Sequence, residues 1–463
     1  MASVAPITPA EEGSPTFDEP LLKMESGLIG MWGEGITTVT FFRGDMQAAA
    51  AFLKERLAAV AEANPWIWGT LVKEKQHGKL AHLRFSRGAA PAVPDCAFQM
   101  EAFTLSEEME YGAMVQAVSK SGAKLPQGRK LLNTPQCVSK LTVVPTAEGF
   151  AVIFSMSHTV VNGGTYYQIL NMLTATPIVA MKTERRDTLR EAVDSYMGKS
   201  HFAYLNGAIN GFNALGKVLF GKTPAAHCFV VDDEKLARAK ALEKAKPGAP
   251  ARLSANDVLT SAYGRACKSR LLVCAHPHPP SPALTRSPSP AQPHPLALAL
   301  TSDPLTLSHP APPSHPQIMA CDFKGRIEGT SAEDAAQYHG GLLFDENGYA
   351  EPAAIRGALS GPPPCSKAAL PGCCEGLKCK TALITSWAAF KDLAIPGSTL
   401  TLHTPCEQTS GMVVKAQDDT CIVFNPRPGK IAMLCISNKL SADELMAALP
   451  FEGPLAPKMW PPK

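Results

Sequence analysis

Residues 149–173, GFAVIFSMSHTVVNGGTYYQILNML, place three structural signals in direct succession. The apolar run at the start is bounded by turn residues and predicts a buried strand. His158 follows this strand, and Gly163 and Gly164 then form a turn in which the backbone is free to adopt unusual conformations. Apolar residues at helical spacing come next and predict an amphipathic helix: Tyr166, Ile169, Leu170 and Leu173. The stretch therefore requires a sheet packed on helices, with a histidine presented at the end of a strand.

The rest of the chain repeats this mixture of strands and helices. Residues 45–64 predict an amphipathic helix that ends at Asn64-Pro65, and residues 66–74 and 80–86 predict two paired strands. Residues 380–437 contain several short strand-like runs separated by Gly, Pro and Asp, and residues 441–451 predict a last helix. The fold class expected is α/β (α+β), with mixed, mostly antiparallel sheets covered by helices.

One segment differs in composition from everything around it. Residues 275–317 contain thirteen prolines, five histidines and only two charged residues, Arg286 and Asp303. So many prolines exclude a helix or a central strand, and the segment has too few large apolar residues for a core. The histidines suggest either metal binding or simple low-complexity composition, and because metal sites need a structured frame we favour the second interpretation. We therefore predict a disordered insert.

The length allows two packed domains, because 463 residues that are 45% hydrophobic can bury a large core. The expected organisation is a flexible lead-in, an N-terminal subdomain, a charged helical connector and a C-terminal subdomain split by the Pro/His-rich insert. The corresponding ranges are 1–16, 17–230, 231–250, 251–274 with 318–463, and 275–317 for the insert.

Charge and cysteine content narrow the class of protein. Forty-four basic residues nearly balance forty-one acidic ones, which gives no field for nucleic acid, and no apolar run reaches the roughly 18 residues of a membrane span. The first residues lack the pattern of a leader peptide. Thirteen cysteines, mostly single, fit a reducing compartment, so we expect a cytoplasmic protein. The cluster Cys365, Cys373, Cys374 and Cys379 lacks the paired spacing of zinc ligands, and no metal site is predicted.

The pattern His158-x-x-x-Asn162-Gly163 is the best candidate for a catalytic site. A neutral imidazole with an ordinary pKa near 6.5 is suited to remove a proton from a hydroxyl or an amine. Asn162 can hydrogen-bond the loop, and backbone N–H groups near Gly163 are placed to stabilise an oxyanion. A purely structural histidine at a strand end is the alternative that spacing alone leaves open.

These segments resemble the chloramphenicol-acetyltransferase-like superfamily, which includes plant BAHD acyltransferases and nonribosomal peptide condensation domains. SHTVVNGGTYY, 157–167, is similar to their His-x-x-x-Asp-Gly motif. The other resembling segments lie in the same order as in the superfamily: ANPWIWGTLV (63–72), SANDVLTSAYGRA (254–266) and ACDFKGRI (320–327). Asn162 replaces an Asp that pairs with an Arg in the superfamily. The Asp-Phe-Gly-Trp-Gly motif of the plant branch is not found, and Trp387 is the one suggestive residue near its place.

The resemblance implies two similar subdomains with a channel between them, and His158 near the middle of the channel. It implies transfer of an acyl group from a thioester, most simply acyl-CoA as co-substrate without other cofactors, to a small hydroxyl or amine acceptor. His158 is then the general base, Asn162 supports the motif loop and Gly163 lies on the oxyanion side. We expect a monomeric enzyme of secondary metabolism that forms a ternary complex. The alternative is a non-catalytic relative that binds an acyl or aromatic metabolite or a partner protein.

A few other residues have two interpretations each. Tyr166 and Tyr167 line either the core or a channel, and we favour the core. Thr385 and Ser386 offer hydroxyls to an oxyanion or belong to a strand edge. Arg326 either lies near the motif loop or is a solvated surface residue. Trp66 and Trp68 alternate in a predicted strand, so both are expected on one face.

Overall fold

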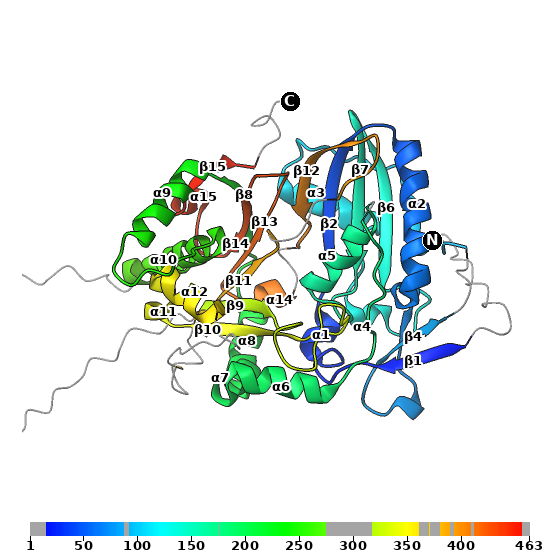
Figure 1. The fold of residues 1–463 in the computed structure, drawn as a ribbon, viewed down its shortest axis with the longest axis horizontal. Coiled ribbons are helices and arrows are strands. Elements are labelled where there is room, and N and C mark those ends of the chain that lie inside the picture. Colours follow the sequence, from blue (N-terminus) through cyan, green and yellow to red (C-terminus); the bar gives the residue numbers. More distant parts are fainter. Residues whose placement is uncertain are drawn as a thin grey trace, which may run out of the picture.

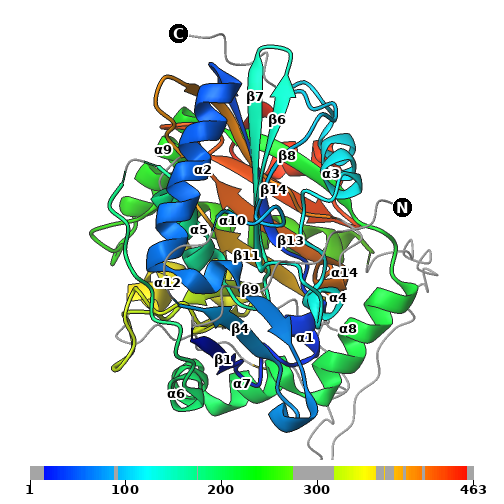
Figure 2. The same ribbon diagram turned by 90° about the vertical axis from the view of Figure 1, so that its right-hand side faces the viewer.

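A computed structural model of the chain describes residues 15–87, 92–174, 176–274, 317–360, 370, 380–388, 393–408 and 412–455. Two large sheets stand side by side, with helices on their outer faces and helix α5 (Gly163–Met172) between them (Figure 1). A quarter turn brings α2 (Met46–Ala63) to the front, and the two sheets then lie one behind the other (Figure 2). We call the five-stranded sheet and its helices the first half, and the seven-stranded sheet and its helices the second half.

The first half is built on a five-stranded sheet in the order β12-β2-β7-β6-β5. Its strands are β2 (Ile36–Arg43), β5 (Phe98–Met100), β6 (Ser139–Thr146), β7 (Gly149–Met156) and β12 (Thr399–Pro405). Side chains alternate along β7, as the two-residue period of a strand requires. Phe150, Val152 and Phe154 pack in the cluster that includes α2 and α5, whereas Ala151 and Ile153 face α3 (Tyr111–Lys120).

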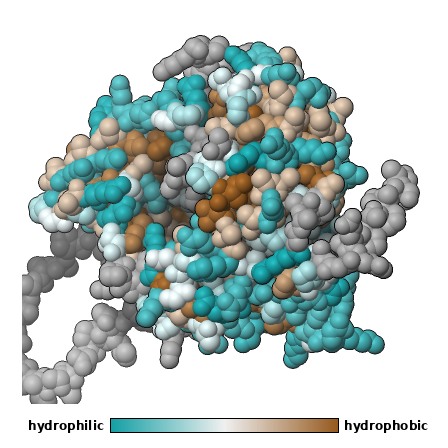
Figure 3. All heavy atoms as spheres, turned by 45° about the vertical axis from the view of Figure 1, so that its right-hand side comes forward, coloured by the Kyte–Doolittle hydropathy of each residue, from teal (hydrophilic) through white to brown (hydrophobic). Residues whose placement is uncertain are grey.

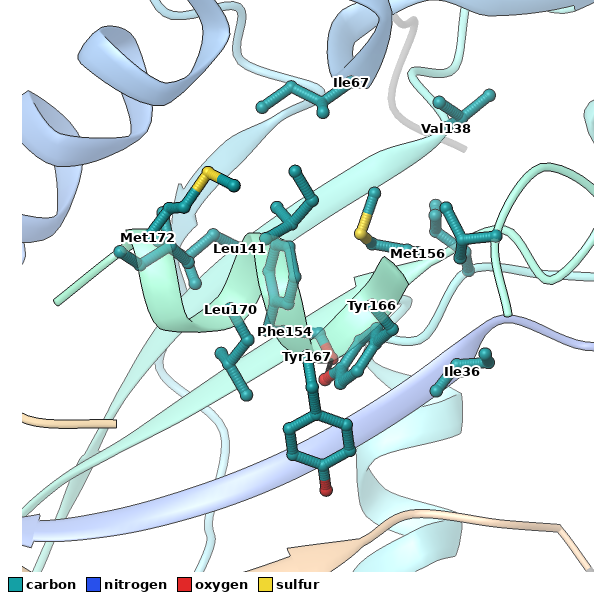
Figure 4. Close-up of a cluster of buried hydrophobic side chains, with 14 of the residues drawn as sticks. Ile36, Ile67, Val138, Leu141, Phe154, Met156, Tyr166, Tyr167, Leu170 and Met172 are labelled. Atoms are coloured by element: carbon teal, nitrogen blue, oxygen red, sulfur yellow. Dashed lines mark hydrogen bonds between the residues drawn. The ribbon is translucent and has the colours of Figure 1, made fainter. Parts of the chain in front are cut away.

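The cluster under α5 shows why the motif region is rigid. Tyr166 and Tyr167 enter the apolar cluster from α5, beside Phe154 of β7 and Ile36 of β2 (Figure 4). Both tyrosines are buried, and the Phe154 and Tyr166 rings lie 5.3 Å apart. Each large buried side chain stabilises the fold by about 1.5–3 kcal/mol. The prediction that the two tyrosines are core residues is confirmed.

The second half is built on a seven-stranded mixed sheet in the order β10-β9-β11-β13-β14-β8-β15. Its strands are β8 (Ala225–Val231), β9 (Gln317–Asp322), β10 (His339–Phe344), β11 (Ala382–Ser386), β13 (Asp419–Phe424), β14 (Ala432–Ser437) and β15 (Phe451–Pro454). One face packs on α10 (Ala255–Cys274) and α15 (Ala442–Ala448). Ile422, Phe424 and Leu434 on the other face join the core of the first half, so both halves share one hydrophobic cluster.

The two halves of the structure do not correspond to two continuous stretches of sequence, as the predicted domain ranges assume. All of strand β8 except Val231 lies within the predicted N-terminal subdomain, 17–230, but the strand pairs with β14 and β15 of the second half. Strand β12 lies within the predicted C-terminal subdomain but pairs with β2 of the first half. The two halves therefore exchange strands. Periodicity reports that a segment is a strand but not which strand it pairs with, so the boundaries drawn from composition miss the exchange.

A small three-stranded sheet, in the order β1-β4-β3, contains β1 (Thr16–Pro20), β3 (Thr70–Val72) and β4 (His82–Ser86). The strand expected over 66–74 is wrong in its first part, because a 3₁₀ helix, Pro65–Trp68, precedes the short β3. Proline favours the first position of such a turn. Trp66 is buried and Trp68 only half-buried, so the two do not share a strand face.

The remaining elements are short helices and turns. They are α1 (Leu28–Trp32), 3₁₀ turn η2 (Lys75–His77), α4 (Gly128–Leu131), α6 (Asp187–Met197), α7 (Lys199–Asn206), α8 (Ala208–Phe220), α9 (Asp233–Lys244), α11 (Glu346–Ala350), α12 (Pro352–Ser360) and α14 (Met412–Lys415). Helix α9 lies within the range predicted as a charged connector. Among the described residues, no helix is long and apolar enough to cross a membrane. Figure 3 shows a mixed surface with an apolar area near its centre.

Several predictions concern residues outside the described ranges. The lead-in 1–16 is described only from residue 15, and Thr16 already belongs to β1. The insert 275–317 is described only at Gln317, which is buried in β9, so the insert as drawn extends one residue too far. Cys365, Cys373, Cys374 and Cys379 also lie outside the described residues.

Candidate active site

His158 lies in the loop between β7 and α5. The loop ends at Asn162, which caps α5: its side-chain oxygen accepts a hydrogen bond of 2.9 Å from the N–H of Thr165. Asn is among the best N-cap residues, because its oxygen satisfies a helix N–H that has no partner within the helix. The predicted succession of strand, loop and helix over residues 149–172 is confirmed.

The two glycines after the cap are required by close approaches from the second half. A Cβ on Gly163 would lie 3.1 Å from the indole nitrogen of Trp387, which follows β11. A Cβ on Gly164 would lie 2.4 Å from a carboxylate oxygen of Asp322 at the end of β9, so the Asp322 side chain would have to shift. The motif loop is thus packed directly against the second half, and Trp387 contacts the motif.

The imidazole of His158 is half-buried. Burial lowers the pKa of His158 below its ordinary value, and hydrogen bonds to the backbone of His158 and Val161 only partly oppose this effect. A lowered pKa keeps the ring neutral at physiological pH, which is the protonation state that a general base needs.

Three backbone carbonyls of the motif loop are held by side chains from distant segments. The side-chain amide of Gln337 donates to the carbonyl oxygens of His158 and Thr159, the latter at 3.0 Å. The guanidinium of Arg185 donates to the carbonyl of Val160 at 3.1 Å. The loop therefore has a fixed position without an aspartate at residue 162.

Glu25 ties these two side chains together. Its carboxylate accepts from the Nε of Arg185 at 2.8 Å and from the backbone N–H of Gln337 at 3.1 Å. Glu25 is 0% exposed and the Arg185 side chain 1%. Burial raises the pKa of the Glu25 carboxyl, and the charge of Arg185 and two backbone N–H donors oppose the rise. The residues 25, 185 and 337 form what we call the loop clamp, which sequence patterns did not reveal.

Within the described ranges, no charged side chain pairs with Asn162 in the way that the superfamily pattern implies. Its Nδ2 is buried and has no hydrogen-bond partner among the described residues. The ammonium of Lys324 lies nearby instead: it donates to the hydroxyl of Thr165 at 2.7 Å and lies 3.6 Å from Asp322. Arg326 donates to the sulfur of Cys321 at 3.6 Å and makes no recorded bond to the motif loop.

A second histidine, which the sequence analysis missed, lies beside His158. His339 begins β10, and its ring centroid is 6.4 Å from that of His158, with the planes inclined by 44°. Its Nδ1 is buried without a hydrogen-bond partner among the described residues. Burial, together with the charges of His158, Arg190 and Lys324, lowers the pKa of His339 to about 3. The histidine precedes a Gly-Gly pair, but only the fold brings it to the motif.

Metal chemistry has no visible support in the described part of the chain. No group of three or more His, Cys, Asp and Glu side chains there is arranged to hold a metal ion.

Comparison with solved structures identifies the fold. The sequence itself matches no protein-family model, and no curated protein matches it. In structure, the chain is similar to TRI101 of F. graminearum complexed with coenzyme A and deoxynivalenol: TM-score 0.57, 11% identity, covering 93% of this chain and 97% of that one. It is also similar to vinorine synthase, with a TM-score of 0.54, 12% identity and coverage of 96% and 94%.

A third similar structure is the first condensation domain of the CDA synthetase, with a TM-score of 0.53, 11% identity and 93% of each chain covered. The chain thus has the fold of chloramphenicol-acetyltransferase-like proteins, in which two related α/β halves lie side by side. At such low identity the likeness concerns the fold, and the resemblance seen in the sequence is confirmed at that level.

Proposed function

We propose that the protein is an acyltransferase that moves an acyl group from acyl-CoA to a hydroxyl or amine of a small acceptor. The observation that carries the proposal is a neutral, half-buried imidazole, His158, held by the loop clamp where the two halves meet. The similar structure of TRI101 complexed with coenzyme A supports a coenzyme A thioester as donor. A monomeric, cytoplasmic enzyme of secondary metabolism is part of this proposal.

The proposed reaction proceeds in one ternary complex. As the acceptor oxygen or nitrogen attacks the thioester carbonyl, His158 takes its proton. The carbonyl oxygen becomes an oxyanion, which the backbone N–H groups near Gly163 stabilise. The intermediate then expels the coenzyme A thiolate, and His158 returns the proton to this sulfur. No covalent acyl-enzyme is involved.

Substitution His158→Ala tests the proposal. Release of free coenzyme A is measured with acetyl-, hexanoyl- and benzoyl-CoA against a panel of alcohols and amines that includes deoxynivalenol. Loss of a general base lowers kcat by about 10²–10⁴-fold. Because burial lowers the pKa of His158, the midpoint of the decline in kcat/KM on acidification should lie below the ordinary histidine value of about 6.5.

His227→Ala is the matched control, because His227 is a partly buried histidine of β8 in the second sheet. It should retain full activity. Turnover that survives His158→Ala would refute the general-base assignment. Tight binding of acyl-CoA without turnover in the unmutated protein would favour a non-catalytic binding role.

A further inference from the structure

We propose that His339 is a second acceptor-binding residue, whose imidazole hydrogen-bonds the same nucleophilic oxygen or nitrogen that His158 deprotonates. This inference rests on the proposed function. It assigns to His339 the orientation of the nucleophile, whereas the removal of the proton belongs to His158.

The separation of the two rings fits one shared ligand atom. Their centroids are 6.4 Å apart and the planes are inclined by 44°. Two imidazoles that both hydrogen-bond one tetrahedral oxygen at about 2.8 Å have centroids about 6 to 6.5 Å apart. A bridge of two successive ligand atoms between the imidazoles would hold the ring centroids further apart. The separation of 6.4 Å therefore matches the geometry of one bridging oxygen or nitrogen.

The hydrogen bonding of His339 differs from that of a packing histidine. Buried polar groups normally have partners, and those that lack one call for an explanation. His403 shows the ordinary case, because Thr40 and Tyr167 engage both of its ring nitrogens. The Nδ1 of His339 is buried with no partner in the described part of the chain, although the ring as a whole is half-buried. Nδ1 is buried and cannot meet a ligand, whereas Nε2 is not among the buried atoms without a partner, so we assign the ligand contact to Nε2.

The surroundings of His339 keep the ring uncharged. Arg190 donates to its backbone carbonyl, and the charges of Arg190 and Lys324 disfavour a proton on the ring. A neutral imidazole can donate or accept at Nε2, depending on its tautomer. It can accordingly donate to a lone pair of a hydroxyl whose single proton His158 takes, or accept a hydrogen bond from one N–H of an amine whose second N–H proton His158 takes. The two acceptor classes thus use the same pair of histidines.

Three variants of His339 test the proposal. Turnover is measured with acetyl-CoA and the acceptor of the panel that reacts fastest. If only water reacts, the hydrolysis of acetyl-CoA is measured instead. His339→Leu removes the hydrogen bond, and acceptor kcat/KM should fall about 10-fold, with the KM for acetyl-CoA unchanged. His339→Gln places an amide near Nε2 and should restore most of the loss. His339→Asn places its amide near the position of Nδ1 and should not restore the lost kcat/KM.

Thermal unfolding separates this role from packing. His339→Leu removes a buried polar atom without a partner, so its Tm should equal or exceed that of the unmutated protein. A Tm that falls, acceptor kcat/KM within twofold of the unmutated value, or better rescue by Asn than by Gln would each overturn the proposal for His339. A change in the KM for acetyl-CoA alone would mean that His339 contacts the donor and not the acceptor, and this result would also overturn the proposal.

Failure of the proposed function looks different. If His158→Ala keeps its turnover, or if no acceptor including water reacts, the acyl-transfer proposal fails, and the one for His339 fails with it. If His158→Ala is inactive and His339→Leu is fully active, only the assignment of His339 is wrong.

Discussion

Two polar networks involve α5 or the loop before it, and they differ in how completely they are bonded. In the first, His403 of β12 is held through both ring nitrogens, by the Thr40 hydroxyl at 2.8 Å and the Tyr167 hydroxyl at 3.0 Å. In the second, the loop clamp holds the backbone around His158 but leaves the ring of His158 half-buried, and His339 keeps a buried nitrogen without a recorded partner.

The comparison shows that burial and a lowered pKa do not by themselves mark a functional histidine. Burial lowers the pKa of His403 to about 4 and that of His339 to about 3. The two differ in bonding: a closed network stabilises packing, whereas a network with unused hydrogen-bonding capacity is suited to a ligand. The proposed site lies in the open network, at the contact between the halves.

The largest effect is expected from breaking the loop clamp. Glu25→Gln keeps the size of the side chain but leaves Arg185 as a buried charge without its carboxylate. Removal of one partner of a buried ion pair costs about 3–5 kcal/mol, so the free energy of unfolding in urea should fall by that amount. Activity should fall as well, because Gln337 and Arg185 position the motif loop.

Lys23→Gln is the control for the clamp. Lys23 lies two residues away and forms a 3.8 Å ion pair with Asp187 whose two side chains are 74% and 39% exposed. Exposed pairs of this kind contribute about 0–1 kcal/mol. If Glu25→Gln destabilises the protein no more than Lys23→Gln does, the clamp does not support the loop.

Substitution of His403 in the closed network should lower the folding stability and leave the activity nearly unchanged. His403→Phe keeps a ring but removes two hydrogen bonds and leaves Thr40 and Tyr167 without this partner, which should cost about 1–3 kcal/mol. Acyl transfer, measured at saturating substrate, should stay within about twofold of the unmutated rate. A loss of activity larger than the loss of folded protein would contradict the division into closed and open networks.

The loss of folding stability caused by His403→Phe should depend on pH. The pKa of His403 is about 4 in the folded protein and near 6.5 when unfolded, so the unfolded state binds more protons between these values. The unmutated protein therefore loses stability through His403 as pH falls from 6.5 to 4, by roughly 2 kcal/mol at pH 5. His403→Phe lacks this loss, so its disadvantage should shrink on acidification.

The sequence revealed local features of the site but not its long-range contacts. The strand, the loop with His158 and the helix are neighbours in the chain, and periodicity and turn chemistry predict them, whereas the role of Asn162 as the helix cap is seen only in the structure. His339 and Gln337 reach the motif only because β10 and the segment before it are brought there by pairing in the other sheet. No local pattern encodes that pairing.

The same reason explains why the domain ranges predicted from the sequence do not show the exchange of strands. Strands β8 and β12 each look like ordinary members of the segment around them, and only their pairing partners reveal that they cross to the other half. The 3₁₀ helix at Pro65–Trp68 was missed for a local reason, because its aromatic residues favour a strand while the proline favours a turn.

The smallest effect is expected from Asn162→Asp, which restores the residue of the superfamily pattern. Aspartate caps a helix as well as asparagine does, and its charge is favourable by about 0.3–1 kcal/mol at a helix N-terminus. The carboxylate of Asp322, close to Gly164, opposes this gain, whereas the ammonium of Lys324 supports it. The urea midpoint should therefore shift little, and activity should change no more than a few-fold. A collapse in stability would mean that the loop depends on a neutral residue 162, and that the clamp alone does not hold it.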